Sequence, residues 1–128
     1  MASTLARFLP GTEDWVIKPS RGEIWTANFN PTVGREQSGL RPCLVVSADG
    51  LNHSPADITI VIPITSKAKG IASHVQINPP EGGLTLRSFI KCEDIRSIST
   101  DRLVKQLGVV PAATLSDVAS KLKFLLNL

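Results

Sequence analysis

The chain of 128 residues has no tyrosine, one methionine, two cysteines and two histidines. RNA-recognition modules that stack bases on their strands need phenylalanine and tyrosine there, so the absence of tyrosine argues against that class. Neither Cys43 and Cys92 nor the two histidines have the spacing of a metal-binding motif, so we expect no metal and no other cofactor. Both cysteines lie in apolar, strand-like contexts, which predicts buried, reduced thiols of a cytoplasmic protein.

The chain also lacks long hydrophobic runs. The longest ones, such as Ile58–Ile64 and Phe124–Leu126, are far shorter than the roughly 20 apolar residues that cross a bilayer. The amino terminus has no uninterrupted apolar signal core, so we expect neither secretion nor a membrane partner. There is no G-x-x-x-x-G-K-[ST] or G-x-G-x-x-G loop and no G-x-S-x-G motif, although the composition leaves a Ser-His-Asp hydrolase open.

The remaining composition is ordinary for one small globular domain, with 42% hydrophobic and 20% charged residues. The net charge of +3 is compatible with a polyanionic partner such as nucleic acid but does not require one. Residues 1–20 are interrupted by Pro10, Gly11 and Pro19, so we expect a loosely ordered arm with a helical turn at Thr4–Phe8. The compact domain is expected over residues 21–128.

The region after the arm contains many short β-strand patterns. Alternation and apolar runs with β-branched residues predict strands at Ile24–Phe29, Pro42–Ser47, Ile58–Ile64, His74–Ile77, Phe89–Cys92 and Ile95–Ile98. Turn-forming clusters separate them at Asn30-Pro31, Asp49-Gly50, Ser54-Pro55 and Pro79–Gly83. Many short strands at regular spacing predict a mainly β fold, either a small barrel or a sandwich.

The carboxyl-terminal region has a helical period instead. One stripe holds the apolar residues Leu115, Val118, Ala119, Leu122, Leu125 and Leu126. Thr114 and Asp117, just after Pro111, resemble a capping box with Asp in place of Glu. We expect this helix to pack on the sheet, and its apolar tail to be buried in the core rather than in a dimer surface.

The loop Gly34–Pro42, which runs directly into the apolar segment Cys43–Ser47, is the first candidate site. Its glycines permit unusual backbone angles, and Pro42 favours an extended conformation at Arg41. A guanidinium has five donors in a rigid fork that matches phosphate geometry. Glu36 on the same loop is placed to act as a base or to hold Arg41, and the alternative interpretation is a surface ion pair.

Two further segments carry chemistry. Thr65 and Ser66 leave the strongest predicted strand, where their hydroxyls can donate to a phosphate oxygen or simply cap the turn before Lys67. The cluster Lys91–Arg96 is densely charged, and strand alternation would send Lys91 and Glu93 to one face and Cys92 and Asp94 to the other. A solvated sheet edge is the alternative interpretation of this cluster.

These segments, in this order, resemble the MazF/PemK family of toxin endoribonucleases. The resemblance runs through Arg21-Gly22-Glu23-Ile24-Trp25, Asn30-Pro31-Thr32, Gly34–Ser47, Ile62–Ser66, His74-Val75, Glu93–Ile98 and Asp101-Arg102-Leu103. It implies an SH3-like β-barrel with a packed carboxyl-terminal helix, acting as a homodimer in the cytoplasm. It also implies a type II toxin that cuts single-stranded RNA at short motifs without metal and is neutralised by a MazE-like antitoxin, with DNA contacted only through that antitoxin.

The reaction that the resemblance implies is attack of a ribose 2′-hydroxyl on the adjacent phosphate, leaving a 2′,3′-cyclic phosphate and a 5′-hydroxyl. Arg41 and Thr65 match the family's catalytic residues, and Glu36 matches a glutamate proposed as a base in some members. Because a guanidinium has a pKa above about 12, Arg41 is a poor base and suits charge stabilisation instead. Glu36 is the more natural base, and Thr65 would donate a hydrogen bond to a non-bridging oxygen.

The expected RNA contacts follow the same alignment of motifs. They comprise Arg35, Gln37, Ser66, Lys67, Lys91, Glu93 and Asp94. Arg35 replaces the family's usual serine and adds a cation beside the RNA path. Lys91 stands where one branch has a catalytic arginine, whose fork a lysine does not reproduce. Glu93 and Asp94 match base-contacting positions, where carboxylates accept from base amino groups.

Two other functions are compatible with the fold. A gyrase poison resembling CcdB would bind topoisomerase and would not need the pair Arg41 and Thr65. An inactive RNA-binding module would keep the barrel and the RNA affinity without turnover. The cleavage motif depends on the loops Thr32–Gly39 and Ser66–Ser73, whose shapes the sequence does not give.

Overall fold

The computed structural model describes residues 5–8, 15–29 and 39–128, with side chains from Lys18 onward. Its strands are β1 (Leu5–Phe8), β2 (Trp15–Lys18), β3 (Glu23–Asn28), β4 (Leu40–Val45), β5 (Ile58–Thr65), β6 (His74–Ile77), β7 (Ser88–Lys91), β8 (Arg96–Ser99) and β9 (Leu103–Val109). Its helices are α1 (Asp49–Asn52), α2 (Ala112–Leu126) and the 3-10 turns η1 (Glu81–Gly83), η2 (Cys92–Asp94) and η3 (Thr100–Arg102).

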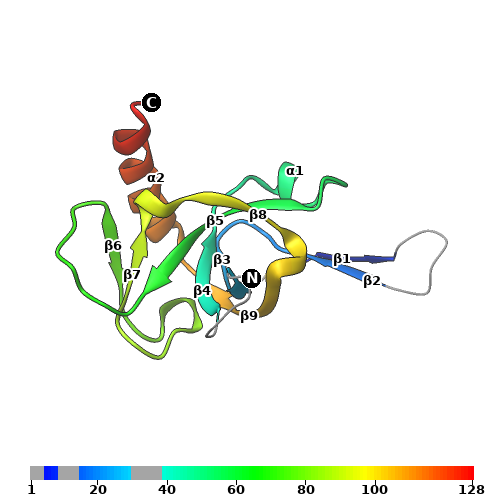
Figure 1. Cartoon of the computed structure of the whole chain (residues 1–128), viewed down its shortest axis with the longest axis horizontal. Helices are drawn as coiled ribbons and strands as arrows, with labels where there is room; N and C mark the ends of the chain where they lie inside the picture. The colour runs from blue at the N-terminus through cyan, green and yellow to red at the C-terminus, as the bar shows by residue number, and fades with distance from the viewer. Residues whose placement is uncertain (1–4, 9–14, 30–38) are drawn as a thin grey trace.

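The main sheet has seven antiparallel strands. Its order is β6-β7-β5-β4-β3-β9, and β8 also pairs with β5. The sheet curls, and α2 crosses near its β6–β7 end (Figure 1). The predicted mainly β fold with a packed carboxyl-terminal helix is therefore confirmed, with one correction: the described strands do not close into a hydrogen-bonded ring.

Strands β7 and β8 lie on the same side of β5, with η2 between them. The register pairs Ile64 with Ile90 and Val61 with Arg96, so three extra residues bulge out of the β7–β8 segment. The bulge lies opposite Ile62 and Pro63, and proline has no N–H to donate to a neighbouring strand. This interruption turns the charged cluster after Lys91 out of the sheet.

Two apolar clusters lie on alternate residues of β3, β4 and β5. The larger includes Ile24, Leu44 and Ile62, and α2 packs onto it through Leu115, Val118 and Leu122. The smaller contains Trp25, Ala27, Cys43, Val45 and Val61. Because successive strand side chains point to opposite faces, the two clusters occupy opposite faces of the same strands.

The amino-terminal strands form a separate two-stranded sheet (Figure 1). Leu5–Phe8 is a strand paired with Trp15–Lys18, so the predicted helical turn at Thr4–Phe8 is wrong. Lys18 is only 2% exposed, and its Nζ lies 2.5 Å from Asp57 Oδ1 and 3.2 Å from the Ser54 carbonyl oxygen. Ser20 is also buried, and its Oγ is 3.0 Å from His53 Nε2. The division into an arm and a domain at residue 20 stays a prediction.

All six predicted strands are present: His74–Ile77 has the predicted bounds, and the ends of the others differ by at most two residues. The strand Leu103–Val109 was not predicted, and the Asp49-Gly50 segment, predicted as a turn, begins the short helix α1. The capping-box prediction is wrong, because α2 begins at Ala112 without a side-chain cap. Thr114 lies inside the helix, and its hydroxyl donates to the Glu81 carboxylate.

The predicted burial of the helix tail is also wrong at the last turn. Leu115, Val118 and Leu122 contact the core, but Leu125 and Leu126 are exposed, and so is Phe124. The last turn of α2 extends beyond the sheet (Figure 1), so the apolar stripe continues past the part of the helix that packs on the core.

Candidate active site

Arg41 and Thr65 lie on the neighbouring strands β4 and β5. The last pair between these strands is Cys43 with Pro63, and Arg41 and Thr65 each lie two residues beyond it, so the same register continued would set them opposite each other. Residues directly opposite in antiparallel strands point to the same face. Arg41 and Thr65 therefore project from the end of the face that carries the smaller apolar cluster.

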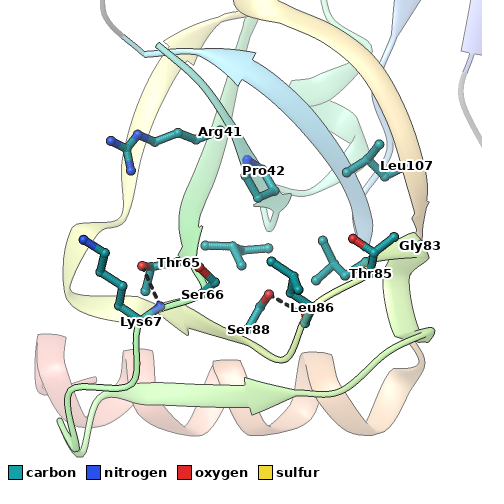
Figure 2. Close-up of a pocket in the computed structure, with 12 residues that line it drawn as sticks. Arg41, Pro42, Thr65, Ser66, Lys67, Gly83, Thr85, Leu86, Ser88 and Leu107 are labelled. Atoms are coloured by element: carbon teal, nitrogen blue, oxygen red, sulfur yellow. Dashed lines mark hydrogen bonds between the residues drawn. The ribbon is translucent and has the colours of Figure 1, made fainter. Parts of the chain in front are cut away.

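Both residues line an open hollow of about 400 Å³ (Figure 2). Its other lining residues come from β4, β5, the β5–β6 loop, the η1–β7 segment and β9: Pro42, Ile64, Ser66, Lys67, Gly83, Leu84, Thr85, Leu86, Ser88 and Leu107. The Arg41 guanidinium and the Lys67 amine extend to the same side of the hollow, and the Thr65 hydroxyl lies near the Lys67 side chain (Figure 2). Two cations and a hydroxyl on one side of a hollow suit a phosphate group.

The Thr65 hydroxyl already has one partner. The backbone N–H of Lys67 donates to Thr65 Oγ1 at 3.2 Å, so Thr65 caps the turn as the alternative interpretation proposed. A hydroxyl that accepts one hydrogen bond keeps its own proton to donate. The turn bond therefore holds the Thr65 oxygen in place while its O–H remains available to a ligand.

The opposite wall depends on a close backbone approach between η1 and β9. A Cβ on Gly108 would lie 2.5 Å from the Gly82 carbonyl carbon, and one on Gly83 would lie 2.0 Å from the Leu107 carbonyl oxygen. Only glycines allow this contact, and Gly83 itself has a φ of 78°. The contact brings Gly83 and Leu107 into the wall of the hollow.

A second hollow of about 300 Å³ shares Arg41 and Thr65 with the first and continues toward η2. Lys91 and Asp94 line it and form an ion pair with 2.9 Å between Nζ and Oδ2. The predicted strand alternation in this cluster is wrong, because η2 places Lys91 and Asp94 together and buries Cys92 alone.

Glu93 lies away from both hollows and is held by the β5–β6 loop. Ser73 Oγ donates to Oε1 at 2.5 Å, and His74 Nε2 lies 2.9 Å from Oε2. Desolvation raises the pKa of Glu93, but the hydrogen bonds from Ser73 and His74 outweigh it, so the pKa is lowered overall. The carboxylate thus ties the loop that follows Ser66 and Lys67 to η2.

The two cysteines are free and buried, as predicted. Burial raises the pKa of the Cys43 thiol to about 12 and that of the Cys92 thiol to about 11. Thiolates are therefore scarce at neutral pH, and neither residue has the properties of a nucleophile.

A comparison with protein families gives the identity of the fold. The family described as "PemK-like, MazF-like toxin of type II toxin-antitoxin system" matches residues 20–126. The chain belongs to this family. The match covers both strands that carry Arg41 and Thr65, and the resemblance found in the sequence is confirmed.

Characterised relatives of this MazF/PemK-like chain are endoribonucleases. It is 36% identical over 113 residues to the endoribonuclease MazF9 of Mycobacterium tuberculosis, covering 84% of this chain and 96% of the relative. It is 35% identical over 88 residues to the endoribonuclease EndoA of Bacillus subtilis, covering 68% and 76%. The prediction that the chain is an enzyme of the endoribonuclease class is confirmed at the level of this family.

Solved structures agree. The crystal structure of MazF from Deinococcus radiodurans superposes with a TM-score of 0.72 and 32% identity, covering 87% of this chain and 98% of the other. A MazE–MazF structure from the same organism gives a TM-score of 0.74 and 33% identity, covering 86% and 96%. None of these findings supports the gyrase-poison alternative.

Three predicted site residues, Arg35, Glu36 and Gln37, lie outside the described residues. Ser66, Lys67, Lys91 and Asp94 do line the two hollows of this MazF/PemK-like chain, whereas Glu93 does not. The sequence analysis missed the wall residues Leu84, Leu86 and Leu107, since isolated leucines in loops and an irregular strand give no periodic signal.

Two negative observations hold for the part of the chain that the structure describes. No three histidine, cysteine, aspartate or glutamate side chains gather there in a metal-binding arrangement. Within the same residues, no helix has the length and apolarity needed to cross a membrane.

Proposed function

We propose that this chain is a toxin enzyme that cuts single-stranded RNA at short specific sequences without a metal ion. The observation that carries the proposal is that Arg41 and Thr65, on the neighbouring strands β4 and β5, line one open hollow. The endoribonuclease relatives, which match along most of their length, support the same reaction class.

The proposed reaction is an internal transfer at one phosphate. The ribose 2′-oxygen forms a bond to phosphorus while the bond from phosphorus to the 5′-oxygen breaks. The 2′-hydroxyl gives its proton to Glu36, and the 5′-oxygen takes a proton from the Arg41 guanidinium, so the transfer of the Glu36 proton back to Arg41 restores both side chains. The products are a 2′,3′-cyclic phosphate and a 5′-hydroxyl, so the electron pairs and atoms balance without a further reactant.

Each role follows from the chemistry of its side chain. Arg41 donates hydrogen bonds to the charge that develops on the phosphorane and to the leaving oxygen. Thr65, held by the Lys67 N–H, donates its hydroxyl proton to a non-bridging oxygen. Glu36 is the proposed base, because a guanidinium remains protonated at all ordinary pH values.

RNA binding is proposed for the residues around this pair. Ser66 and Lys67 line the first hollow, and Lys91 and Asp94 line the second. Arg35 and Gln37 complete the set by their place on the loop before Arg41. Glu93 accepts one internal hydrogen bond on each carboxylate oxygen, and the remaining lone pairs can accept from a base amino group.

We further propose that the chain works as a cytoplasmic homodimer with a MazE-like antitoxin. The MazF relative from Deinococcus radiodurans was solved together with MazE, which supports such a partner here. An acidic antitoxin tail would compete with RNA for the cations of the groove, and DNA would be reached only through the antitoxin.

The test is to incubate long, weakly structured RNA with the protein in excess EDTA and to map the fragment ends. The wild type is expected to give discrete cuts with 5′-hydroxyl ends, and Arg41→Ala to lose about 10³-fold in kcat/KM. Thr65→Ser, which keeps the hydroxyl, is expected to retain most activity, whereas Thr65→Val loses about 10²-fold.

The matched control is Lys123→Ala, which removes an exposed cation from the last turn of α2 and leaves the hollow untouched. A requirement for Mg²⁺, or full cleavage by a folded Arg41→Ala variant, contradicts the proposal. Intact RNA together with accumulating DNA breaks in growth-arrested cells would instead favour a gyrase poison.

A further inference from the structure

A third hollow continues the groove beyond the candidate active site. It has a volume of about 460 Å³ and is lined by Phe29, Arg96, Ser97, Ile98, Ser99 and Arg102. Phe29 and Arg96 also line the second hollow, just as Arg41 and Thr65 line both the first and the second. The three hollows therefore form one track, with Arg41 and Thr65 where the first hollow meets the second.

Arg96 stands where the second and third hollows meet. Val61, its partner on β5, belongs to the smaller apolar cluster, so Arg96 projects on the same face as Arg41. Its guanidinium carbon lies 4.5 Å from the centroid of the Phe29 ring. A guanidinium stacked on an aromatic ring is held flat, and its second face can stack on a nucleotide base.

The third hollow also contains groups that suit a phosphate. Arg102 donates one N–H to the Asn28 carbonyl oxygen at 3.0 Å, and a guanidinium has four further N–H donors. Ser99 Oγ accepts from the Asp101 N–H, which leaves the hydroxyl proton of Ser99 free to donate. No carboxylate is found among the described residues that line this hollow.

The charge along the whole track has one dominant sign. Of the described residues that line the three hollows, five are cations and one is a carboxylate: Arg41, Lys67, Lys91, Arg96 and Arg102 against Asp94. Asp94 is itself paired with Lys91. A polyanion with unstacked bases, such as single-stranded RNA, fits this combination of cations and a stacking surface.

We infer that the Phe29–Arg96–Arg102 hollow is a nucleotide subsite for RNA that extends beyond the scissile phosphate. In this subsite a nucleotide base of the RNA stacks on one face of the Arg96 guanidinium, whose other face contacts the Phe29 ring. Arg102 and Ser99 bind a phosphate of the RNA backbone. This inference rests on the proposed function, because it takes RNA as the ligand. It adds a binding determinant that the sequence motifs around Arg41 and Thr65 do not contain.

The test compares a long oligoribonucleotide that reaches the subsite with one truncated on that side of the mapped cleavage position. Arg96→Gln is expected to lower kcat/KM about tenfold more for the long RNA than for the truncated RNA, through KM rather than kcat. Arg96→Lys keeps the positive charge but removes the planar guanidinium on which the base would stack. It is therefore expected to lower kcat/KM for the long RNA as Arg96→Gln does, while the salt dependence of binding stays as in the wild type.

Binding of a non-cleavable 2′-deoxy analogue by fluorescence anisotropy separates this inference from the proposed function. Loss of affinity of Arg96→Gln for the long analogue supports the subsite, whether or not the RNA is cut. Equal effects on long and truncated RNA, or none in a folded variant, overturn the subsite while cleavage by the wild type stands. If the wild type neither binds nor cuts RNA, both proposals fail.

Discussion

At the scale of single residues, the charged cluster around η2 divides into one ion pair and one hydrogen-bonded carboxylate, with different surroundings. Lys91 and Asp94 form an ion pair that borders the groove. Glu93 is hydrogen-bonded to Ser73, in the β5–β6 loop, and to His74, the first residue of β6. His74 has a side chain only 4% exposed, and its Nδ1 has no partner among the described atoms. Glu93 is therefore a structural carboxylate whose loss would loosen the loop that presents Ser66 and Lys67.

The lowered pKa of Glu93 gives this link a pH dependence. A carboxyl whose pKa is depressed on folding stabilises the chain above its ordinary value of 4.5, and this stabilisation disappears as the pH falls through the folded pKa. Glu93→Gln is therefore expected to destabilise the chain more at pH 7 than at pH 3, where less of the Glu93 carboxyl is ionised. Urea unfolding at both pH values measures this difference. An equal gap at the two pH values would show that the charge of Glu93 contributes nothing.

The residues of the candidate site differ in how far the sequence could predict them. Arg41 and Thr65 stand in motifs at the ends of apolar strands, and the family resemblance named both as site residues. Their place at one hollow could therefore be predicted. The position of Glu93 was not predictable, because η2 breaks the alternation that sequence patterns assume. Arg96 and Phe29 lie far apart in the chain, and only the pairing of β8 with β5 brings the arginine to this face.

At the scale of elements, the approach of η1 to β9 shapes the wall of the active-site hollow. β9 has a Lys105-Gln106 pair and Gly108 in its interior, and register shifts interrupt its pairing with β3. Because of these irregularities, β9 lacks the alternation of polar and apolar residues from which a strand is predicted. The strands with continuous apolar runs, such as β5, were predictable because their residues are buried on both faces.

Gly108→Ala tests this contact. A methyl group there would lie within 2.7 Å of Gly82 and Gly83 backbone atoms, so we expect a loss of about 1–3 kcal/mol in unfolding free energy. Cleavage activity is expected to fall as well, because Gly83 lines the hollow. Gly50→Ala is the matched control: nothing lies within 4 Å of its added methyl, and alanine favours the helix α1. Unfolding curves and RNA cleavage of both variants give the comparison, and equal stability of the two would contradict this account.

At the scale of the whole molecule, the described surface has one apolar region at the end of α2. Phe124 is 83% exposed, Leu126 52% and Leu128 85%. A hollow of about 370 Å³ between Phe124, Leu125 and the loop residues Ala72 and Ser73 adjoins this region. Clustered apolar side chains of this kind are typical of an interface, which agrees with the proposed homodimer.

Phe124→Glu is expected to shift the protein from dimer toward monomer, because a charge would have to be buried in the interface. The fold is expected to survive, since Phe124 makes little contact within its own chain. Light scattering after size-exclusion chromatography gives the mass, and the urea midpoint confirms folding. Lys123→Ala, one residue earlier and also exposed, is expected to leave the mass unchanged. A dimer that persists in Phe124→Glu would place the interface on another surface.

Lys18, the buried lysine at the end of β2, bears on where a shortened form of this protein could begin. The family match begins at residue 20, but Lys18 lies inside the protein and holds Asp57, a residue with φ of 56° at the turn into β5. The family model and the packed part of the chain thus do not begin at the same residue. A chain cut at residue 20 would lose this internal cation and leave Asp57 without its ion pair. Asp57 lies directly before β5, the strand that ends at Thr65.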